Sequence, residues 1–269
     1  MQYRIKEVSK LIDVPIDTLR YYEKIGVISP NIDEKNHYRY YDAWDINFLL
    51  EYMYYRKMDY STKEILKFIH QASLDEQIKF VKEKQEYYLE KYNYYDLLLK
   101  RNHRFIDSLE KINQELNSIQ IISSNAYHYL AYRHNYQFNQ RQELHNITSS
   151  WLKKYPFVDD LVLIPQEVIL NQEANEYYWC FAIQSQYFQM MKLSKNEFVK
   201  TIPQQTCIRT IVDAKEQGMF HYNLLDHVMT FIKDHNFQLT GDPFGILLIR
   251  THENGTLHRY IEFFIPIKY

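Results

Sequence analysis

The sequence predicts a multi-domain chain of three parts: a small, mainly helical head, a long unbroken helix, and a C-terminal α+β domain. Short apolar helical repeats fill residues 1–73, and residues 74–118 contain neither proline nor glycine. In residues 119–269 the apolar pattern changes to strand-like runs interrupted by two helical segments. At 269 residues with 46% hydrophobic side chains, the chain can bury a core in both globular parts.

The head has the pattern of two short helices, a hairpin and two more helices. Pro15 suits the first turn of the second helix, which Gly26 ends. A polar loop then leads to the strand-like run 37–41, and Asp42 and Ser61 are the expected N-caps of the last two helices. The expected apolar face of the third helix consists of Trp44, Phe48, Leu49, Tyr52 and Met53. This order predicts a winged helix-turn-helix.

Residues 74–118 carry a heptad repeat with apolar or aromatic side chains at nine of its twelve core positions. One core position takes Ile78, Gln85, Tyr92, Leu99, Ile106 and Asn113, and its partner takes Val81, Tyr88, Tyr95, Asn102, Leu109 and Leu116. The repeat predicts a coiled coil that pairs two chains, parallel or antiparallel. The alternative is an amphipathic helix packed on its own chain, which needs a large apolar surface elsewhere in that chain.

After residue 119 the order β-α-β-β occurs twice. Strands are expected at 125–134, 160–165, 177–184, 202–213, 245–252 and 258–267, and helices at 138–154 and 219–236. Asn254-Gly255 is a favourable centre for the hairpin that joins the last two strands. The repeated order predicts an internally duplicated α+β domain.

Composition narrows the range of functions. Cys180 and Cys207 are too few for a disulfide framework and lack the spacing of a metal site. No apolar run is long enough to span a membrane, and no leader pattern opens the chain. The formal net charge is −2, so any nucleic-acid surface must be local. We expect a cytoplasmic protein without membrane segment, metal or cofactor.

The most specific pattern is TLRYYEKIGVISP followed by HYRYYDAWDI. It resembles the MerR family of transcription regulators, whose pattern runs T-L-R-Y-Y-E, then G-L-hydrophobic-x-P, then G-Y-R-x-Y. The resemblance covers residues 3 to about 70 and extends to the dimerising helix. It implies DNA contacts from the recognition helix (Thr18, Arg20, Tyr21 and Tyr22), the first wing (Tyr38 and Arg39) and the second wing (Arg56 and Lys57). The forked guanidinium of an arginine can donate hydrogen bonds to a phosphate or to the edge of a guanine, and a tyrosine can contact the DNA backbone or a thymine methyl group.

Two residues depart from the family pattern. His37 stands where the first wing has glycine, and Asp59 stands where the second wing has it. The second change puts a carboxylate near the expected phosphates.

The C-terminal part is similar to the effector domain of the multidrug-sensing members of this family, the GyrI-like or BmrR-like fold. The order of elements and the closing strand carry this similarity. In that group a Glu of the final strand meets lipophilic cations in an aromatic pocket, and Glu262 matches it. A carboxylate within this apolar run is costly unless it is paired or faces a cavity. The alternatives are a Glu on a solvated sheet face, or one paired with an internal Arg such as Arg133 or Arg250.

Further pocket candidates follow from strand alternation, because every second residue of a strand shares a face. They are Tyr127, Tyr129, Tyr177, Trp179, Phe181, Tyr222 and Phe264. Aromatic rings can stack on a planar ligand or hold a cation, although each of these residues is equally suited to a core. Metal sensing, another role in the family, uses Cys near the end of the dimerising helix, and residues 74–118 contain none.

These features predict a homodimeric, ligand-responsive transcription regulator without enzymatic activity. The resemblance implies activation by promoter distortion, with promoter DNA, RNA polymerase and a lipophilic small molecule, cationic or neutral, as partners. One alternative is a ligand-independent regulator whose C-terminal domain binds a protein. The other is an effector domain with slow hydrolase activity.

Overall fold

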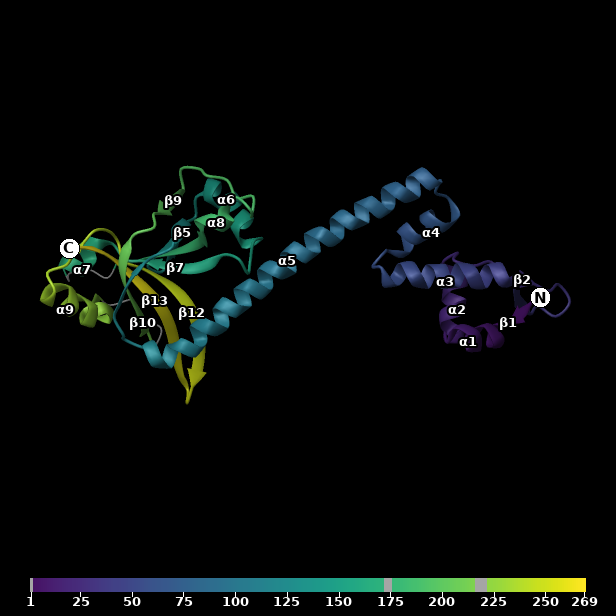
Figure 1. Ribbon diagram of the computed structural model, residues 1–269, viewed down its shortest axis with the longest axis horizontal. Helices are drawn as coiled ribbons and strands as arrows, with labels where there is room; N and C mark the ends of the chain where they lie inside the picture. Colours follow the sequence, from purple (N-terminus) through teal and green to yellow (C-terminus); the bar gives the residue numbers. More distant parts are fainter. Residues whose placement is uncertain (1, 172–175, 216–221) are drawn as a thin grey trace. The chain divides into compact units, whose positions relative to one another are not determined.

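The computed structural model describes residues 2–171, 176–215 and 222–269. These residues form two compact units, Met1–Asn93 and Tyr94–Tyr269, which meet within helix α5 (Leu74–Glu115) (Figure 1). The long helix is thus confirmed, and it ends three residues earlier than expected. Within the described ranges, no helix combines the length and the apolar character that a membrane crossing requires.

The first unit is a helix-turn-helix with a small antiparallel sheet (Figure 1). Its helices are α1 (Ile5–Ile12), α2 (Ile16–Lys24), α3 (Ala43–Lys57) and α4 (Thr62–His70), followed by α5. Its strands are β1 (Tyr3–Arg4), β2 (Asn31–Ile32) and β3 (Arg39–Tyr41), in the order β1-β3-β2. The expected order of helices and hairpin is confirmed.

The predicted caps of this unit form as expected. The side chain of Asp42 accepts a hydrogen bond from the backbone N–H of Asp45 at 3.0 Å. Ser61 Oγ likewise accepts from the N–H of Glu64 at 3.3 Å. Gly26 ends α2 with φ +79°, a conformation that glycine adopts without strain.

The core of the first unit lies between α1, α2, α3 and α4. It includes Val8, Leu19, Tyr41, Leu49, Tyr52 and Ile65, all almost completely buried. The expectation that Trp44 lies on the apolar face of the third helix is wrong, because this residue is 69% exposed. It lies in the first turn of α3, two residues after the Asp42 cap, and the buried face of the helix begins only at Ile46.

The second unit is built on one large antiparallel sheet. Its main strands are β4 (Gln120–Ser123), β5 (Tyr127–His134), β7 (Asp159–Leu163), β8 (Tyr178–Gln184), β10 (Thr206–Asp213), β12 (Phe244–Glu253) and β13 (Thr256–Lys268). Short strands β6 (Gln137–Phe138), β9 (Val199–Ile202) and β11 (Gln238–Leu239) extend it. The helices are α6 (Gln142–Leu152), α7 (Gln166–Asn171), α8 (Ser185–Phe188), the 3-10 turn η1 (Tyr222–Leu225) and α9 (Asp226–Asp234).

The strand order confirms the duplicated topology. The path through the sheet is β4-β10-β13-β12-β7-β8-β5-β6. Strands β5, β7 and β8 with α6 form one β-α-β-β repeat, and β10, β12 and β13 with α9 form the other. The repeats meet where β12 pairs with β7, so each contributes three adjacent strands in mirrored order.

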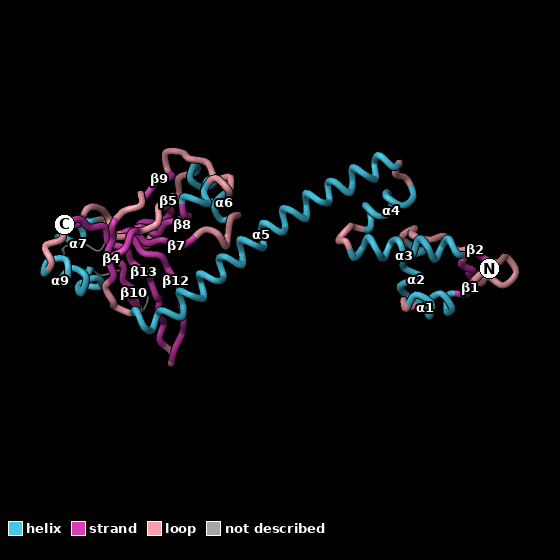
Figure 2. The backbone as a smooth tube through the Cα atoms, in the orientation of Figure 1, coloured by secondary structure: helices cyan, strands magenta, loops and turns pink. Residues whose placement is uncertain are grey.

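The two faces of the sheet differ. On one face, α7 and α9 cover one repeat, and α6 and α8 cover the other (Figures 1 and 2). The opposite face carries a separate apolar cluster that includes Tyr127, Leu161, Phe244, Ile246 and Phe264. No helix among α6 to α9 contributes to that cluster, which leaves this face for the C-terminal part of α5.

The strand expected at 202–213 begins later, at Thr206, and forms β10. Its expected first residue, Ile202, ends the separate strand β9, and Pro203 after it lacks the N–H that a central strand must donate. The preceding segment, β9, pairs with β5, whereas β10 pairs with β13 and β4. Of the helix expected at 219–236, residues 219–221 lie outside the described part of the chain, and the described part consists of η1 and α9, which ends at Asp234.

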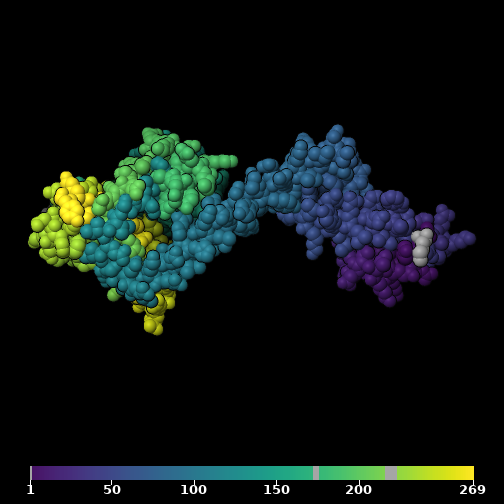
Figure 3. Space-filling view, in the orientation of Figure 1, coloured from purple at the N-terminus to yellow at the C-terminus, as the bar shows by residue number. Residues whose placement is uncertain are grey.

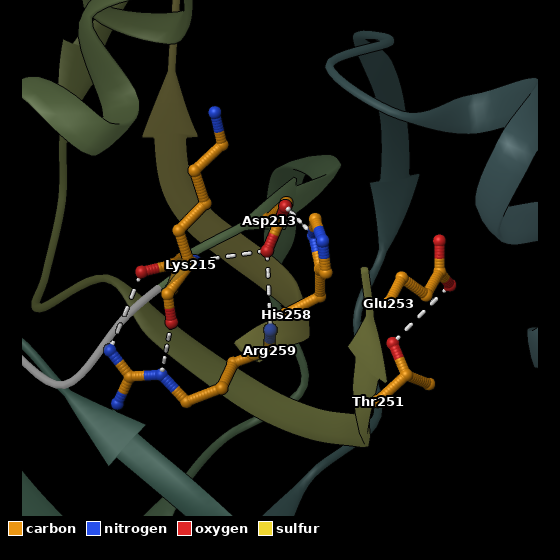
Figure 4. Close-up of polar contacts among 7 residues, drawn as sticks. Asp213, Lys215, Thr251, Glu253, His258 and Arg259 are labelled. Carbon is orange, nitrogen blue, oxygen red and sulfur yellow. Dashed lines mark hydrogen bonds and ion pairs between the residues drawn. The ribbon is translucent and has the colours of Figure 1, made fainter. Parts of the chain in front are cut away.

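Turns at one end of the second repeat fix the last two strands. Asn254 and Gly255 take φ +50° and +81°, as expected for the centre of a tight hairpin. At the end of β10, Asp213 accepts hydrogen bonds from the N–H groups of Lys215 and Arg259, and pairs with His258 Nδ1 at 2.6 Å (Figure 4). Burial opposes ionisation of Asp213, but these bonds lower the pKa of its carboxyl overall.

Candidate functional site

Helix α2 presents the predicted recognition residues on one side of the first unit. Tyr22 is half-buried and packs against Tyr52, with ring centroids 4.9 Å apart. Burial, with a contribution from Tyr52, raises the pKa of Tyr22, so its hydroxyl stays neutral. Tyr21 and Arg20 point away from the core and are exposed, and Thr18 is partly buried. Tyr22 therefore anchors the helix, while Arg20 and Tyr21 remain accessible.

Arg20 is held only loosely. Its Nη1 lies 3.4 Å from Asp17 one turn earlier, and the two side chains are 64% and 93% exposed. A pair this exposed contributes about 0–1 kcal/mol, so the guanidinium can exchange Asp17 for a phosphate at little cost.

The wing strand is tied to the end of the recognition helix. Arg39 Nε donates to both carboxylate oxygens of Glu23, each at 2.9 Å. The guanidinium of Arg4 lies 5.6 Å from the ring centre of Tyr38, which is exposed. The predicted wing residue Arg39 is therefore held against α2, whereas Tyr38 lies beside Arg4 at the start of α1. Among the residues that the structure describes, Glu23 is the ion-pair partner of Arg39.

The last two predicted DNA contacts lie at the end of α3. Arg56 Nη1 donates to the carbonyl of Tyr60 at 2.6 Å, which bridges the turn between α3 and α4. Lys57, the last residue of α3, is exposed. Arg56 thus has a structural role in the turn, whereas Lys57 is available to a partner.

The second unit has a cleft of about 400 Å³ on the sheet face that α6 to α9 leave uncovered. Apolar side chains from β4, β5, β12 and β13 form its floor: Ile122, Tyr127, Ile246 and Phe264. The C-terminal part of α5 forms its wall with Arg101, Arg104, Phe105 and Lys111. In Figure 3, yellow atoms of the last strands are visible in a hollow bordered by the teal atoms of α5.

Glu262 lines this cleft and is paired. Its Oε1 lies 2.5 Å from Nε of Arg209, whose Nη1 lies 2.5 Å from Glu115 Oε2 and 3.1 Å from Gln120 Oε1. The side chains of Arg209, Glu262 and Glu115 are only 12%, 18% and 21% exposed. The hydrogen bond from Arg209 is the main reason that the pKa of Glu115 is lowered. An internal arginine does neutralise Glu262, but it is Arg209 and neither Arg133 nor Arg250.

A second ion pair joins α5 to the sheet at the edge of the cleft. Arg101 Nη2 lies 2.6 Å from Asp159 Oδ1 at the start of β7. Burial raises the pKa of Asp159 although Arg101 acts in the opposite direction. Tyr127 lies on the floor nearby, and burial, with Asp159 next in importance, raises its pKa to about 12. The cleft thus combines a neutral aromatic floor with a charged wall.

The structure brings only some of the predicted ligand residues together. Glu262, Tyr127 and Phe264 line the cleft, and Tyr129 lies on the same sheet face in a neighbouring hollow. Tyr177, Trp179 and Phe181 are buried on the opposite face, beneath the helices. Tyr222 begins η1, and its side chain lies outside the described part of the chain.

Comparisons with known proteins assign the first unit. The family model described as "MerR HTH family regulatory protein" matches residues 3–72. The chain is 32% identical over 74 residues to the HTH-type transcriptional regulator SkgA of Caulobacter vibrioides, which covers 28% of this chain and 27% of that protein. The matched part of the chain therefore spans about a quarter of that relative's length. Residues 3–72 are a MerR-type helix-turn-helix domain.

Two further proteins share longer stretches with this chain. The HTH-type transcriptional activator mta of Bacillus subtilis is 22% identical over 119 residues, 44% of this chain and 42% of that protein. The cryo-EM structure of EcmrR in complex with DNA covers 99% of both chains at 16% identity, with a TM-score of 0.38.

The two departures from the family pattern both have a backbone conformation that favours glycine. His37 and Asp59, which replace glycines, have φ values of +58° and +61°, in the left-handed region that favours glycine. Asp59 is also held by α5: its carboxylate accepts from the Tyr87 hydroxyl at 3.0 Å, and its carbonyl accepts from Lys84 Nζ. The Asp59 carboxylate is therefore engaged within the MerR-type unit.

We expect His37→Gly to stabilise the wing by about 0.5–1 kcal/mol. Glycine removes the Cβ strain of a left-handed residue, about 1–2 kcal/mol, and partly offsets this by the extra freedom of the unfolded chain. Hydrogen exchange at the N–H of Asp33, which bonds to the carbonyl of Tyr38, should slow about two- to fivefold. His37→Ala keeps the Cβ and serves as the control. Equal exchange rates in both variants would show that the wing is not strained.

The main residue that sequence reasoning missed is Arg209. It is the one charged residue of the run Cys207–Val212, and it shares the Glu262 face because it pairs with Phe264 across the strands. A lone arginine in a central strand was an available signal, since such a charge requires a buried partner.

Proposed function

We propose that this chain is a DNA-binding transcription regulator of the MerR type. The observation that carries the proposal is the family match over residues 3–72 together with the exposed basic and aromatic side chains of α2 and the wing. The exposed residues are Arg20, Tyr21, Tyr38 and Arg39, together with Lys57 at the end of α3. The proposed DNA surface also includes Thr18 and Tyr22, which are partly buried on α2, and Arg56, which supports the adjacent turn. The direct test is selection of duplex DNA from a random library by the full-length chain. Failure to enrich any sequence contradicts the proposal.

The regulator acts as a homodimer in this proposal. Core positions of the heptads, among them Ile78, Val81, Tyr92, Leu99 and Ile106, are exposed along α5. An apolar stripe of this length is costly in water, and pairing with a second α5 buries it. This exposure supports dimerisation over packing of the helix against its own chain.

The regulator activates transcription by distorting promoter DNA for RNA polymerase. The similarity to mta, which is named a transcriptional activator, supports activation. A paired helix-turn-helix unit reads two half-sites, and a change in their spacing alters the shape of the DNA between them.

The cleft beside Glu262 is the proposed effector site. Its floor is apolar and aromatic, and it opens on a cluster in which the carboxylates of Glu262 and Glu115 share the single guanidinium of Arg209. Within this largely buried cluster the two carboxylates exceed the guanidinium by one charge. The other charged groups that line the cleft, Arg101, Arg104 and Lys111 with Asp107 and Asp159, lie along its wall and outside this cluster, so the excess negative charge is local to Glu262 and Glu115. A lipophilic cation complements this charge while its apolar body covers the floor.

We expect Glu262→Gln to weaken binding of a cationic dye about tenfold and to leave a neutral dye within about twofold. Glutamine keeps the shape of the side chain but removes the charge that attracts a cation. Calorimetric titration of the full-length chain with methylene blue and with neutral Nile red measures both affinities. Glu253→Gln, in the hairpin beyond the cleft, is the control. Equal losses for both dyes, or none, would assign Glu262 a purely structural role.

A further inference from the structure

Arg209 occupies the position that a cationic effector would need. Its Nε is 2.5 Å from Glu262 Oε1, so the carboxylate proposed to attract the ligand already has a cation. The same guanidinium reaches Glu115 in the last turn of α5 and Gln120 at the start of β4. One side chain therefore connects the floor of the cleft with the end of the long helix.

Displacing Arg209 from Glu262 is possible only because it keeps another carboxylate. A buried guanidinium without a partner is strongly disfavoured. With Glu115 in place, the guanidinium loses one of two carboxylates and retains the other as well as Gln120. Glu115 thus lowers the cost of admitting a cation, although it lies on the far side of Arg209 from Glu262.

The end of α5 is attached to the strand that carries Arg209. The N–H of Asn117 donates to the carbonyl of Ile211 in β10 at 2.7 Å, and Leu116 forms a bridge with the same residue. Any redistribution of Arg209 between Glu262 and Glu115 therefore acts where the helix joins the sheet.

We propose that Arg209 competes with a cationic effector for the carboxylate of Glu262: the effector displaces Arg209 from Glu262, and Arg209 stays bound to Glu115. This inference rests on the proposed effector function of the cleft. It makes Glu115 and Arg209 determinants of cation selectivity, and it links occupancy of the cleft to the contact between α5 and β10. By thermodynamic reciprocity, a ligand that strengthens the Arg209–Glu115 contact is itself bound more tightly because of it.

The test compares Glu115→Gln with wild type in the full-length chain, using methylene blue and Nile red. Glutamine removes the carboxylate that retains Arg209, so methylene blue should bind about tenfold more weakly while Nile red is unchanged. Glu110→Gln, an exposed residue of α5 that does not line the cleft, is the matched control. Arg209→Met should have the opposite effect and raise methylene blue affinity, because it removes the guanidinium that competes with the dye for Glu262.

A second measurement does not depend on the folding of the Arg209 variant. Methylene blue should slow hydrogen exchange at the N–H of Asn117 in wild type and not in Glu115→Gln, and Nile red should slow it in neither. If Glu262→Gln selectively loses methylene blue but Glu115→Gln binds it like wild type, the effector site stands and this inference is overturned. If wild type binds neither dye, the effector function fails, and the inference fails with it.

Discussion

A chain carrying Leu99→Asp is expected to sediment as a monomer under conditions in which the wild type is a dimer. Leu99 is a core position of the heptad repeat near the middle of α5, and it is 61% exposed in the single chain. In a coiled coil this side chain inserts between residues of the partner helix. A carboxylate there would be buried without a partner, at a cost of several kcal/mol for each chain.

Asn93→Asp provides the matched control, because it introduces the same charge one residue after the core position Tyr92, on the outer side of the helix. Sedimentation velocity at several concentrations distinguishes the two variants. The Asn93 variant should behave like wild type. A Leu99→Asp chain that remains dimeric would move the pairing surface away from the heptad seam.

Local signals explain why the first unit could be predicted in detail. Asp42, Ser61, Pro15 and Gly26 each act within one turn of the chain, and each defines a helix end in the structure. His37 and Asp59 also show the limit of such signals: both adopt a left-handed backbone conformation, which these residue types do not favour. At these two positions the surrounding hairpin and turn determine the backbone conformation.

The second unit shows which kind of information the sequence lacks. The alternation of side chains along β8 correctly predicted that Trp179 and Cys180 lie on opposite faces of the strand. It could not show that helices cover the Trp179 face, which is why Tyr177, Trp179 and Phe181 belong to the core and not to the cleft. Coverage depends on how the two repeats join at β7 and β12, a contact between segments far apart in the chain.

The same limitation applies to Glu262. Its position in an apolar strand indicated a partner or a cavity, and the structure supplies both. The identity of the partner depends on the register between β10 and β13. In this register Ile211 lies opposite Glu262 and Arg209 lies opposite Phe264, so Arg209 is the next residue of β10 on the same face as Glu262. Arg133 and Arg250, the arginines that sequence reasoning suggested, lie on other strands: Arg133 on β5, and Arg250 near Asp160.

Replacement of Arg20 by alanine is expected to weaken binding to the selected duplex about 10- to 100-fold. Arg20 lies on the exposed side of α2, and its only ion pair is the weak one with Asp17 among the residues that the structure describes. A lost charged contact to phosphate or base costs about 1–3 kcal/mol. If the contact is to a phosphate, the slope of log affinity against log salt concentration should also flatten by about one unit per chain.

Asp17→Asn is the informative companion to Arg20→Ala, because the two changes should act in opposite directions. Removing Asp17 frees the guanidinium and takes away a carboxylate that would repel the phosphates, so affinity should rise by a few fold. Fluorescence anisotropy with the selected duplex at three salt concentrations measures both the affinities and the slopes. If Arg20→Ala binds like wild type at every salt concentration, α2 is not the helix that contacts DNA. If both substitutions weaken binding, Asp17 orients Arg20 and does not compete with DNA for it.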